Sequence, residues 1–353
     1  MNIGTRPIGN NTPPYVIAEI GVNHDGRVAR ALELTDAAAE AGADAVKLQL
    51  FQTDLLMSKA AKLAAYQQQA GETDPIEMLS RLELSIKEMG EVVERAHDRG
   101  LHAIVTVFSL ELVAQAESLA WDAYKSASPD LINCPLLDAM AETGKPLIVS
   151  TGASTMDEVM RTVGWLEHAR DRLALLQCVS SYPAPEPAFE GIGALGRATG
   201  LPVGYSDHTN AIETGRDAVA LGAVILERHL THDTRAPGPD HAASLEPAQF
   251  ARYIALVHAA QPSCSRSLGA KAVLACERDV RRVSRQSLTT RMPLPAGHAL
   301  VHTDLTIKRP GTGIEPWRLE QIIGSRLTRP VEADVPMVEA DLAAGGEPLK
   351  RFA

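Results

Sequence analysis

The chain has 353 residues, of which 45% are hydrophobic and 22% are charged, and its formal net charge is −10 at pH 7. This composition is typical of a globular protein with enough residues for two domains. The acidic balance argues against a nucleic-acid surface as the main function, and no apolar run approaches the length that spans a membrane.

We expect a cytoplasmic protein. The N-terminus lacks a basic start followed by an apolar core, so no secretory signal is indicated. None of the four cysteines has CxxC spacing; they are Cys134, Cys178, Cys264 and Cys276. We interpret them as reduced thiols that fill apolar space.

Eight short runs with strand character follow one another along the chain. They lie at Tyr15–Glu19, 43–49, His102–Val107, 123–127, 146–151, 173–179, 202–207 and 223–229. Helices between them are indicated by the stretch Val28–Ala41, which Gly42 ends, and by capping boxes that begin at Ser85 and Thr155. The segment 51–80 has the length of an active-site loop or lid.

These runs predict an α/β fold. Most of them are apolar throughout, which is typical of parallel strands that are buried on both faces. Eight strand–helix units in about 250 residues predict a (β/α)8 TIM barrel, with a doubly wound open sheet as the alternative. No GxGxxG or GxxxxGK[ST] motif follows an early strand, so nucleotide-fold fingerprints are absent. We assign the barrel to residues 1–262.

The amino-acid composition of the chain changes after the predicted barrel. Residues 263–286 are rich in basic and small side chains, among them Arg266, Lys271 and Arg285, and we interpret them as a solvated linker rather than a binding patch. Residues 287–353 contain short strand-like runs and turn signals, which predict a small, β-rich second domain.

Polar residues stand at the carboxyl ends of the predicted strands. They are Glu19, Lys47, Gln49, Thr106, Lys125, Ser128, Ser150, Ser180, Tyr182, Ser206, Asp207, His208 and His229. In a barrel these ends converge on one rim, where barrel enzymes place their chemistry. A buried polar group without a partner costs about 1–3 kcal/mol, so a purely structural barrel would be more stable without them.

Two of these residues are histidines at the ends of consecutive strands, His208 and His229. The ends of neighbouring parallel strands lie about 5 Å apart, so two imidazoles there can share one divalent metal. The alternative is that both residues merely finish buried strands, and the spacing alone leaves both interpretations open.

At this point a family resemblance emerges from several motifs. They are 17–26 (IAEIGVNHDG), 41–49 (AGADAVKLQ), 82–85 (LELS), 143–146 (TGKP), 150–152 (STG), 178–183 (CVSSYP), 204–209 (GYSDHT), 238–241 (GPDH) and 308–311 (KRPG). The chain resembles the N-acetylneuraminate (sialic acid) synthase family, whose barrel carries a C-terminal antifreeze-like (SAF) domain. The motifs occur in family order and cover nearly the whole chain.

The resemblance implies a transferase that condenses phosphoenolpyruvate with an open-chain sugar aldehyde, such as N-acetylmannosamine or a related amino sugar. The products are a 2-keto-3-deoxy nonulosonic acid and phosphate. A divalent metal, Mn2+ or Mg2+, acts as Lewis acid on the aldehyde oxygen. The resemblance also implies a domain-swapped homodimer, with neither nucleic acid nor membrane as a partner.

The resemblance carries roles onto individual residues. Glu19, Lys125, His208 and His229 would be catalytic, and the two histidines would hold the metal. The residues that would hold phosphoenolpyruvate with Lys125 are Lys47, Thr106, Ser128, Ser150, Ser180 and Ser206. The two lysines would supply a local positive field. The residues that would contact the sugar are Gln49, Asp130, Tyr182, Asp240 and, from the SAF domain of the other subunit, Arg309.

Departures from the family pattern cluster on the sugar side. The family has Lys-Ile-x-Ser-Gly-Glu at the fourth strand, where this chain has Lys-Ser-Ala-Ser-Pro-Asp at 125–130. Pro129 stiffens the loop, and Asp130 is one methylene shorter than the usual glutamate. We therefore expect the reaction to be kept while the aldehyde differs from N-acetylmannosamine, for example a 2,4-diacetamido-6-deoxy sugar.

Two other functions remain as alternatives. The first is a Schiff-base aldolase with Lys47 or Lys125 as nucleophile, against which the paired histidines argue. The second is a non-catalytic sugar-acid binding module, in which the SAF domain is the recognition part.

Overall fold

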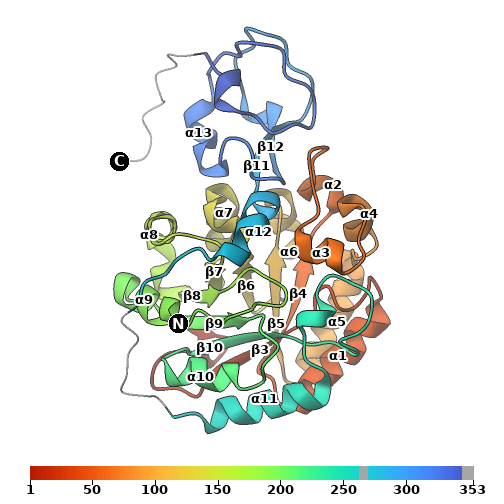
Figure 1. Ribbon diagram of the computed structural model, residues 1–353, viewed down its shortest axis with the longest axis vertical. Coiled ribbons are helices and arrows are strands. Elements are labelled where there is room, and N and C mark those ends of the chain that lie inside the picture. Colours follow the sequence, from red (N-terminus) through yellow and green to blue (C-terminus); the bar gives the residue numbers. More distant parts are fainter. Residues whose placement is uncertain (262–268, 344–353) are drawn as a thin grey trace.

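The computed structural model describes residues 1–261 and 269–343, and a closed barrel of eight parallel strands forms its centre (Figure 1). The strands are β3 (Tyr15–Glu19), β4 (Ala45–Leu50), β5 (His102–Val107), β6 (Ala123–Ser126), β7 (Leu147–Ser150), β8 (Leu173–Cys178), β9 (Val203–Asp207) and β10 (Ile225–His229). They follow chain order around the barrel, and β10 pairs with β3 to close it. The predicted barrel is confirmed, and the alternative prediction of a doubly wound open sheet is wrong.

The strand register brings polar side chains of neighbouring strands together. On one side of Glu19 lies Lys47 of β4, and on the other lies His229 of β10. Thr106 of β5 lies between Gln49 of β4 and Lys125 of β6. Parallel pairing thus aligns the polar strand ends on one rim.

Helices surround the barrel (Figure 1). They are α1 (Val28–Ala41), α5 (Ile86–Asp98), α6 (Val113–Ala116), α7 (Cys134–Glu142), α8 (Met156–Trp165), α9 (Glu190–Thr199), α10 (Thr214–Ala220) and α11 (Pro247–Ala259), with 3-10 turns at Leu110–Leu112, Ser128–Ile132, Glu167–Arg172 and His241–Ala243. Gly42 ends α1 with a φ of 88°, and capping boxes begin α5 at Ser85 and α8 at Thr155, as predicted.

Two hydrophobic clusters fix the barrel. The larger one lies between the strands and the helices, and a second one fills the barrel interior. The interior cluster includes Ile3 from a two-stranded hairpin formed by β1 (Asn2–Ile3) and β2 (Arg6–Pro7). The polar rim is therefore built on a rigid apolar base.

The segment 51–80 folds into three short helices, α2 (Thr53–Leu56), α3 (Ala65–Gln69) and α4 (Pro75–Ser80), beside the carboxyl ends of the strands (Figure 1). Its apolar side chains pack with Phe108, which follows β5. This segment forms one wall of the site, in agreement with its interpretation as an active-site loop.

The interpretation of 263–286 as a solvated linker is wrong for its described part. A 3-10 turn (Ala275–Glu277) and α12 (Arg278–Ser284) lie over the mouth of the barrel, and the side chains of Lys271, Glu277 and Arg285 are buried (Figure 1). The reason is charge pairing with the barrel, because Arg281 and Arg285 both bind Glu158 at the start of α8. Residues 263–268, with Cys264 and Arg266, lie outside the described residues.

The second domain has its own hydrophobic cluster and is β-rich, as predicted. It contains the antiparallel pair β11 (Ser287–Thr290) and β12 (Leu305–Lys308), helix α13 (Leu319–Ile322) and 3-10 turns at His302–Asp304, Pro316–Arg318 and Glu339–Asp341. Across the described parts of both domains, every helix is too short or too polar to span a membrane.

Candidate active site

One hollow at the carboxyl ends of the strands gathers every predicted site residue except Asp130. Its lining includes Glu19, Lys47, Gln49, Thr106, Lys125, Ser128, Ser150, Ser180, Tyr182, Ser206, His208, His229, Asp240 and Arg309. Residues from all eight barrel strands and the loops after them thus meet at a single place, as the barrel predicted.

Buried ion pairs form the floor of the hollow. The Lys47 ammonium pairs with Glu19 and donates to Thr106 Oγ1 at 3.0 Å. Glu227 Oε1 lies 3.2 Å from Lys125 Nζ and accepts from Ser206 Oγ at 2.8 Å, while Glu227 Oε2 lies 3.7 Å from Lys47 Nζ. The expected excess of positive charge is therefore wrong for this floor, where two ammonium groups face two carboxylates.

Desolvation governs the titration of this network. Burial lowers the pKa of Lys47 to about 7, against the opposing attraction of Glu227. The pKa of Glu227 is held below its ordinary value, to about 2, by Lys125 and Lys47, which outweigh its burial. Lys47 can thus give up a proton near neutral pH, whereas Glu227 stays ionised.

Glu227 is a site residue that the sequence analysis missed. It precedes His229 by two positions, and alternate residues of a strand point to the same face. A carboxylate two residues before a strand-end histidine was therefore the signal that could have found it.

Serine hydroxyls surround the turn after β7. The amide of Gly152 donates to Ser128 Oγ at 3.1 Å, and a Cβ at this glycine would lie 2.3 Å from Ser180 Oγ. The hydroxyls of Ser150 and Ser180 are buried and have no hydrogen-bond partner among the described residues. These hydroxyls and the nearby Lys125 ammonium are donors suited to a phosphate or a carboxylate.

The two histidines come together as their spacing predicted. The ring centroids of His208 and His229 are 5.5 Å apart, and the Tyr182 ring lies 4.1 Å from that of His208. His208 Nδ1 lies 2.8 Å from the carbonyl oxygen of Val179, so it carries the proton and leaves the lone pair on Nε2. Burial lowers the pKa of both histidines, which keeps the imidazoles neutral.

This pair fits a divalent metal with substrate-supplied ligands. His208 has the carbonyl partner that fixes a metal-binding tautomer, and the buried Nδ1 of His229 lacks a hydrogen-bond partner among the described residues. Within 1–261 and 269–343, no group of three or more His, Cys, Asp or Glu side chains is placed to hold a metal. A metal held by these two histidines would keep open positions for substrate and water.

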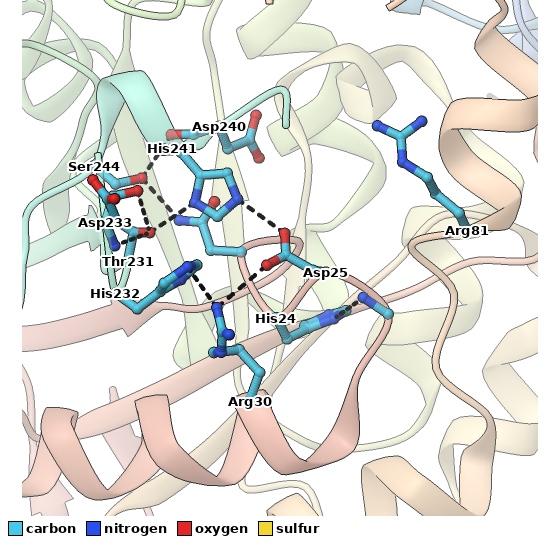
Figure 2. Close-up of polar contacts among 12 residues, drawn as sticks. His24, Asp25, Arg30, Arg81, Thr231, His232, Asp233, Asp240, His241 and Ser244 are labelled. Atoms are coloured by element: carbon cyan, nitrogen blue, oxygen red, sulfur yellow. Dashed lines mark hydrogen bonds and ion pairs between the residues drawn. The ribbon is translucent and has the colours of Figure 1, made fainter. Parts of the chain in front are cut away.

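Asp240 is held at the rim by a polar cluster (Figure 2). Ser244 Oγ donates to its backbone oxygen at 2.6 Å, and Asn23 donates to Ser244 Oγ at 2.8 Å. The next residue, His241, contacts Asp25 at 2.9 Å. Burial raises the pKa of Asp240 to about 6, and its Oδ2 lies 3.8 Å from His229 Nδ1.

Arg309 lines the hollow of its own chain, and its contribution from the other subunit of a domain-swapped dimer stays a prediction. Ser58 donates to the Arg309 carbonyl oxygen from both its amide (3.1 Å) and its hydroxyl (2.7 Å). The guanidinium lies 5.6 Å from the centre of the Phe108 ring. The segment 51–80 therefore anchors the SAF domain over the site.

Asp130 is absent from the lining of the hollow, and its predicted contact with the sugar stays a prediction. Its short side chain belongs to the 3-10 turn Ser128–Ile132, and both carboxylate oxygens are buried without a partner among the described residues. Burial raises its pKa to about 7, against the attraction of Arg309.

An apolar wall completes the hollow on the side of segment 51–80. It consists of Val22, Phe51, Leu56, Met78, Leu79 and Phe108. Helix α12 adds Val280 and Ser284, which the sequence analysis had assigned to a solvated linker.

Comparisons with known proteins agree with this geometry. The NeuB family matches residues 34–268, and the SAF domain matches residues 285–343. The N,N'-diacetyllegionaminic acid synthase of Legionella pneumophila is 35% identical over 344 residues, covering 95% of this chain and 96% of that protein. The synthase of the same name from Campylobacter jejuni is 34% identical, covering 90% of this chain and 97% of that protein.

A solved structure shares both parts of the fold. The spore coat polysaccharide biosynthesis protein spsE of Bacillus subtilis superimposes with a TM-score of 0.84 at 28% identity, covering 98% of this chain and 99% of that chain. The family match extends over more than half of the chain, and most of the site lies within it and the SAF domain, whereas Glu19, Val280 and Ser284 lie outside both matches. The chain belongs to the NeuB family of acid synthases and carries a C-terminal SAF domain.

Proposed function

We propose that this enzyme condenses phosphoenolpyruvate and water with the open-chain aldehyde of a 2,4-diacetamido-6-deoxy sugar, to give a nonulosonic acid and phosphate. The observation that carries the proposal is the convergence of lysines, serines and two histidines in one hollow. A bond forms between C3 of phosphoenolpyruvate and the aldehyde carbon. Water adds at C2, the bond from C2 to the phosphate oxygen breaks, and the aldehyde oxygen takes a proton.

The anionic substrate fits the serine side of the hollow. Ser128, Ser150 and Ser180 surround the Gly152 turn, and Lys125 follows on the adjacent strand. Hydroxyl and ammonium donors hold phosphate and carboxylate oxygens in a fixed orientation. Lys47 of β4 and Glu19 of β3 form an ion pair that would supply a proton donor and an acceptor for the addition of water.

His208 and His229 would hold the divalent metal, Mn2+ or Mg2+, in this site. When bound, the metal supplies Lewis-acid polarisation of the aldehyde oxygen. Tyr182 packs against both histidine rings, so the three side chains together would orient the acceptor.

The apolar wall favours an acceptor with methyl groups. Phe51, Leu56 and Met78 contribute to a wall suited to acetamido and 6-deoxy methyls, each of which gains about 0.8 kcal/mol on burial. Two relatives named N,N'-diacetyllegionaminic acid synthase support the same acceptor class. Arg309 lines the hollow and Asp130 does not, so Arg309 would contact the polar part of the sugar.

A panel of aldehydes tests the proposal. Phosphate release from phosphoenolpyruvate is measured with Mn2+ and either a 2,4-diacetamido-6-deoxy sugar or N-acetylmannosamine. We expect the diacetamido sugar to be preferred at least tenfold in kcat/KM, or about 1.4 kcal/mol. A preference for N-acetylmannosamine would overturn the acceptor assignment and keep the reaction class.

A lysine aldolase is the second candidate, because the lowered pKa of Lys47 suits a Schiff-base nucleophile. Its ammonium, however, is bound to Glu19 and Thr106. Borohydride treatment with pyruvate, followed by mass spectrometry, distinguishes the two: a trapped adduct on Lys47 would favour the aldolase, and an unmodified protein the synthase.

A further inference from the structure

A buried carboxylate outside the strand-end set holds the two loops that carry the serines. Glu277 Oε1 accepts hydrogen bonds from the amides of Ala153 at 2.7 Å and Ser180 at 2.8 Å. Its other oxygen accepts from the amide of Leu274 at 2.8 Å, and its side chain is 1% exposed. One side chain from the segment after the barrel thus connects the loops that follow β7 and β8.

The loop after β7 is also held through other atoms, since the Ala153 carbonyl oxygen accepts from Arg281 at 2.5 Å and Ser154 Oγ accepts from Arg285 at 3.2 Å. Ala153 has a φ of 50°, a conformation that L-residues seldom adopt, and it follows Gly152, where an added Cβ would meet the side chains of Ser128, Cys178 and Ser180. Ser180 has a buried hydroxyl free of any described partner. Glu277 supplies the acceptor for the amides of Ala153 and Ser180, and thereby links the two loops to each other.

Hydrogen bonds and ion pairs fix the segment that carries Glu277. Lys271, also buried, has a pKa lowered to about 8 by burial and partly restored by the attraction of Glu277. Lys271 Nζ donates to Gln177 Oε1 at 3.2 Å, which ties the same segment to the end of β8. Arg281 and Arg285 bind Glu158, which fixes α12 on the barrel. Glu277, directly before α12, is therefore held in position beside the two loops.

We propose that Glu277 is a positioning residue for phosphoenolpyruvate: it sets the Gly152 turn and Ser180 in the geometry that the anionic substrate requires. This inference rests on the proposed function, because it takes phosphoenolpyruvate as the ligand of the serine side. It assigns to the segment between the domains a part in one substrate site. The sugar side of the hollow is the apolar wall formed with segment 51–80, and we expect Glu277 to have no part in it.

Three variants test the role of Glu277. Glu277→Ala leaves two buried amides without an acceptor, and we expect KM for phosphoenolpyruvate to rise roughly 10- to 100-fold with KM for the sugar within twofold. Glu277→Gln keeps an oxygen for both amides but turns an NH2 group toward Leu274, so its effect is smaller, about three- to tenfold. Arg282→Ala is the matched control, since this side chain is exposed on α12 and its one ion pair within 1–261 and 269–343 is with Asp279.

Calorimetric titration with phosphoenolpyruvate accompanies the kinetics. Weaker binding in Glu277→Ala than in Glu277→Gln, with wild-type affinity in Arg282→Ala, supports the proposal whether or not the sugar has been identified. Equal losses for both substrates, or unchanged phosphoenolpyruvate affinity in both Glu277 variants, would overturn it. If Glu277→Ala does not fold, the same split measured in Glu277→Gln decides. Wild-type protein that does not bind phosphoenolpyruvate would instead refute the proposed function together with this inference.

Discussion

Glu158→Gln is the change that tests most sharply how the segment after the barrel is held. Glu158 accepts four hydrogen bonds from the guanidinium groups of Arg281 and Arg285, at 2.7 to 3.0 Å. The side chains of Glu158 and Arg285 are 10% and 5% exposed. The substitution removes the hydrogen-bonded counter-charge of the buried Arg285 guanidinium and leaves it only Glu315, at 3.8 Å, among the described carboxylates.

The expected loss of stability follows from that burial. Removing one partner of a buried, hydrogen-bonded ion pair costs about 3–5 kcal/mol, whereas an exposed pair contributes about 0–1 kcal/mol. For a barrel of this size, we expect Tm to fall by roughly 6–20 °C. Asp279→Asn, which removes the charge from the exposed pair with Arg282 and keeps an oxygen for the amide of Ala65, should change Tm by a few degrees at most.

The same substitution has a pH signature. The two arginines hold the pKa of Glu158 well below its ordinary value of 4.5, so the ionised form is favoured in the folded state. Its contribution to stability is present above that ordinary value and is lost as the pH falls toward the lower folded value. Urea unfolding of wild type and Glu158→Gln should therefore differ fully at pH 7 and converge below about pH 4. An equal free energy of unfolding at pH 7 would refute this account of the docking.

Three further changes probe the hollow. His208→Ala should abolish Mn2+-dependent phosphate release while circular dichroism shows the fold intact, and unchanged turnover would remove the metal assignment. Arg309→Ala should raise KM for the sugar at least tenfold and leave KM for phosphoenolpyruvate within about threefold, because the guanidinium lies over Phe108 on the sugar side; equal effects on both substrates would contradict this placement. Asp130→Asn should gain stability relative to wild type as the pH rises from about 4 to above 7, because burial raises the Asp130 pKa to about 7 and its ionisation destabilises the fold; chemical unfolding at pH 4 and pH 8 measures this, and a constant difference would contradict it.

Local patterns predicted the barrel well. The apolar runs, the left-handed Gly42 and the capping boxes at Ser85 and Thr155 depend on neighbours in the chain, so sequence alone locates them. Once the strands are placed, parallel register brings their polar ends to one rim, which is why so much of the hollow was foreseen.

Long-range pairing accounts for what the sequence did not predict. Arg285 was interpreted as solvated because its partner, Glu158, is 127 positions away. Glu277 accepts from amides that carry no side-chain signal at all. Strand alternation could have identified Glu227. The position of Asp130, outside the lining of the hollow, depends on the path of its 3-10 turn.

The most direct test of the central claim is phosphate release from phosphoenolpyruvate by the wild-type enzyme with Mn2+ and a 2,4-diacetamido-6-deoxy sugar. The account predicts one phosphate released for each nonulosonic acid formed, and no release when the sugar is left out. Phosphate release that does not depend on the sugar, or a product formed from pyruvate in place of phosphoenolpyruvate, would contradict it.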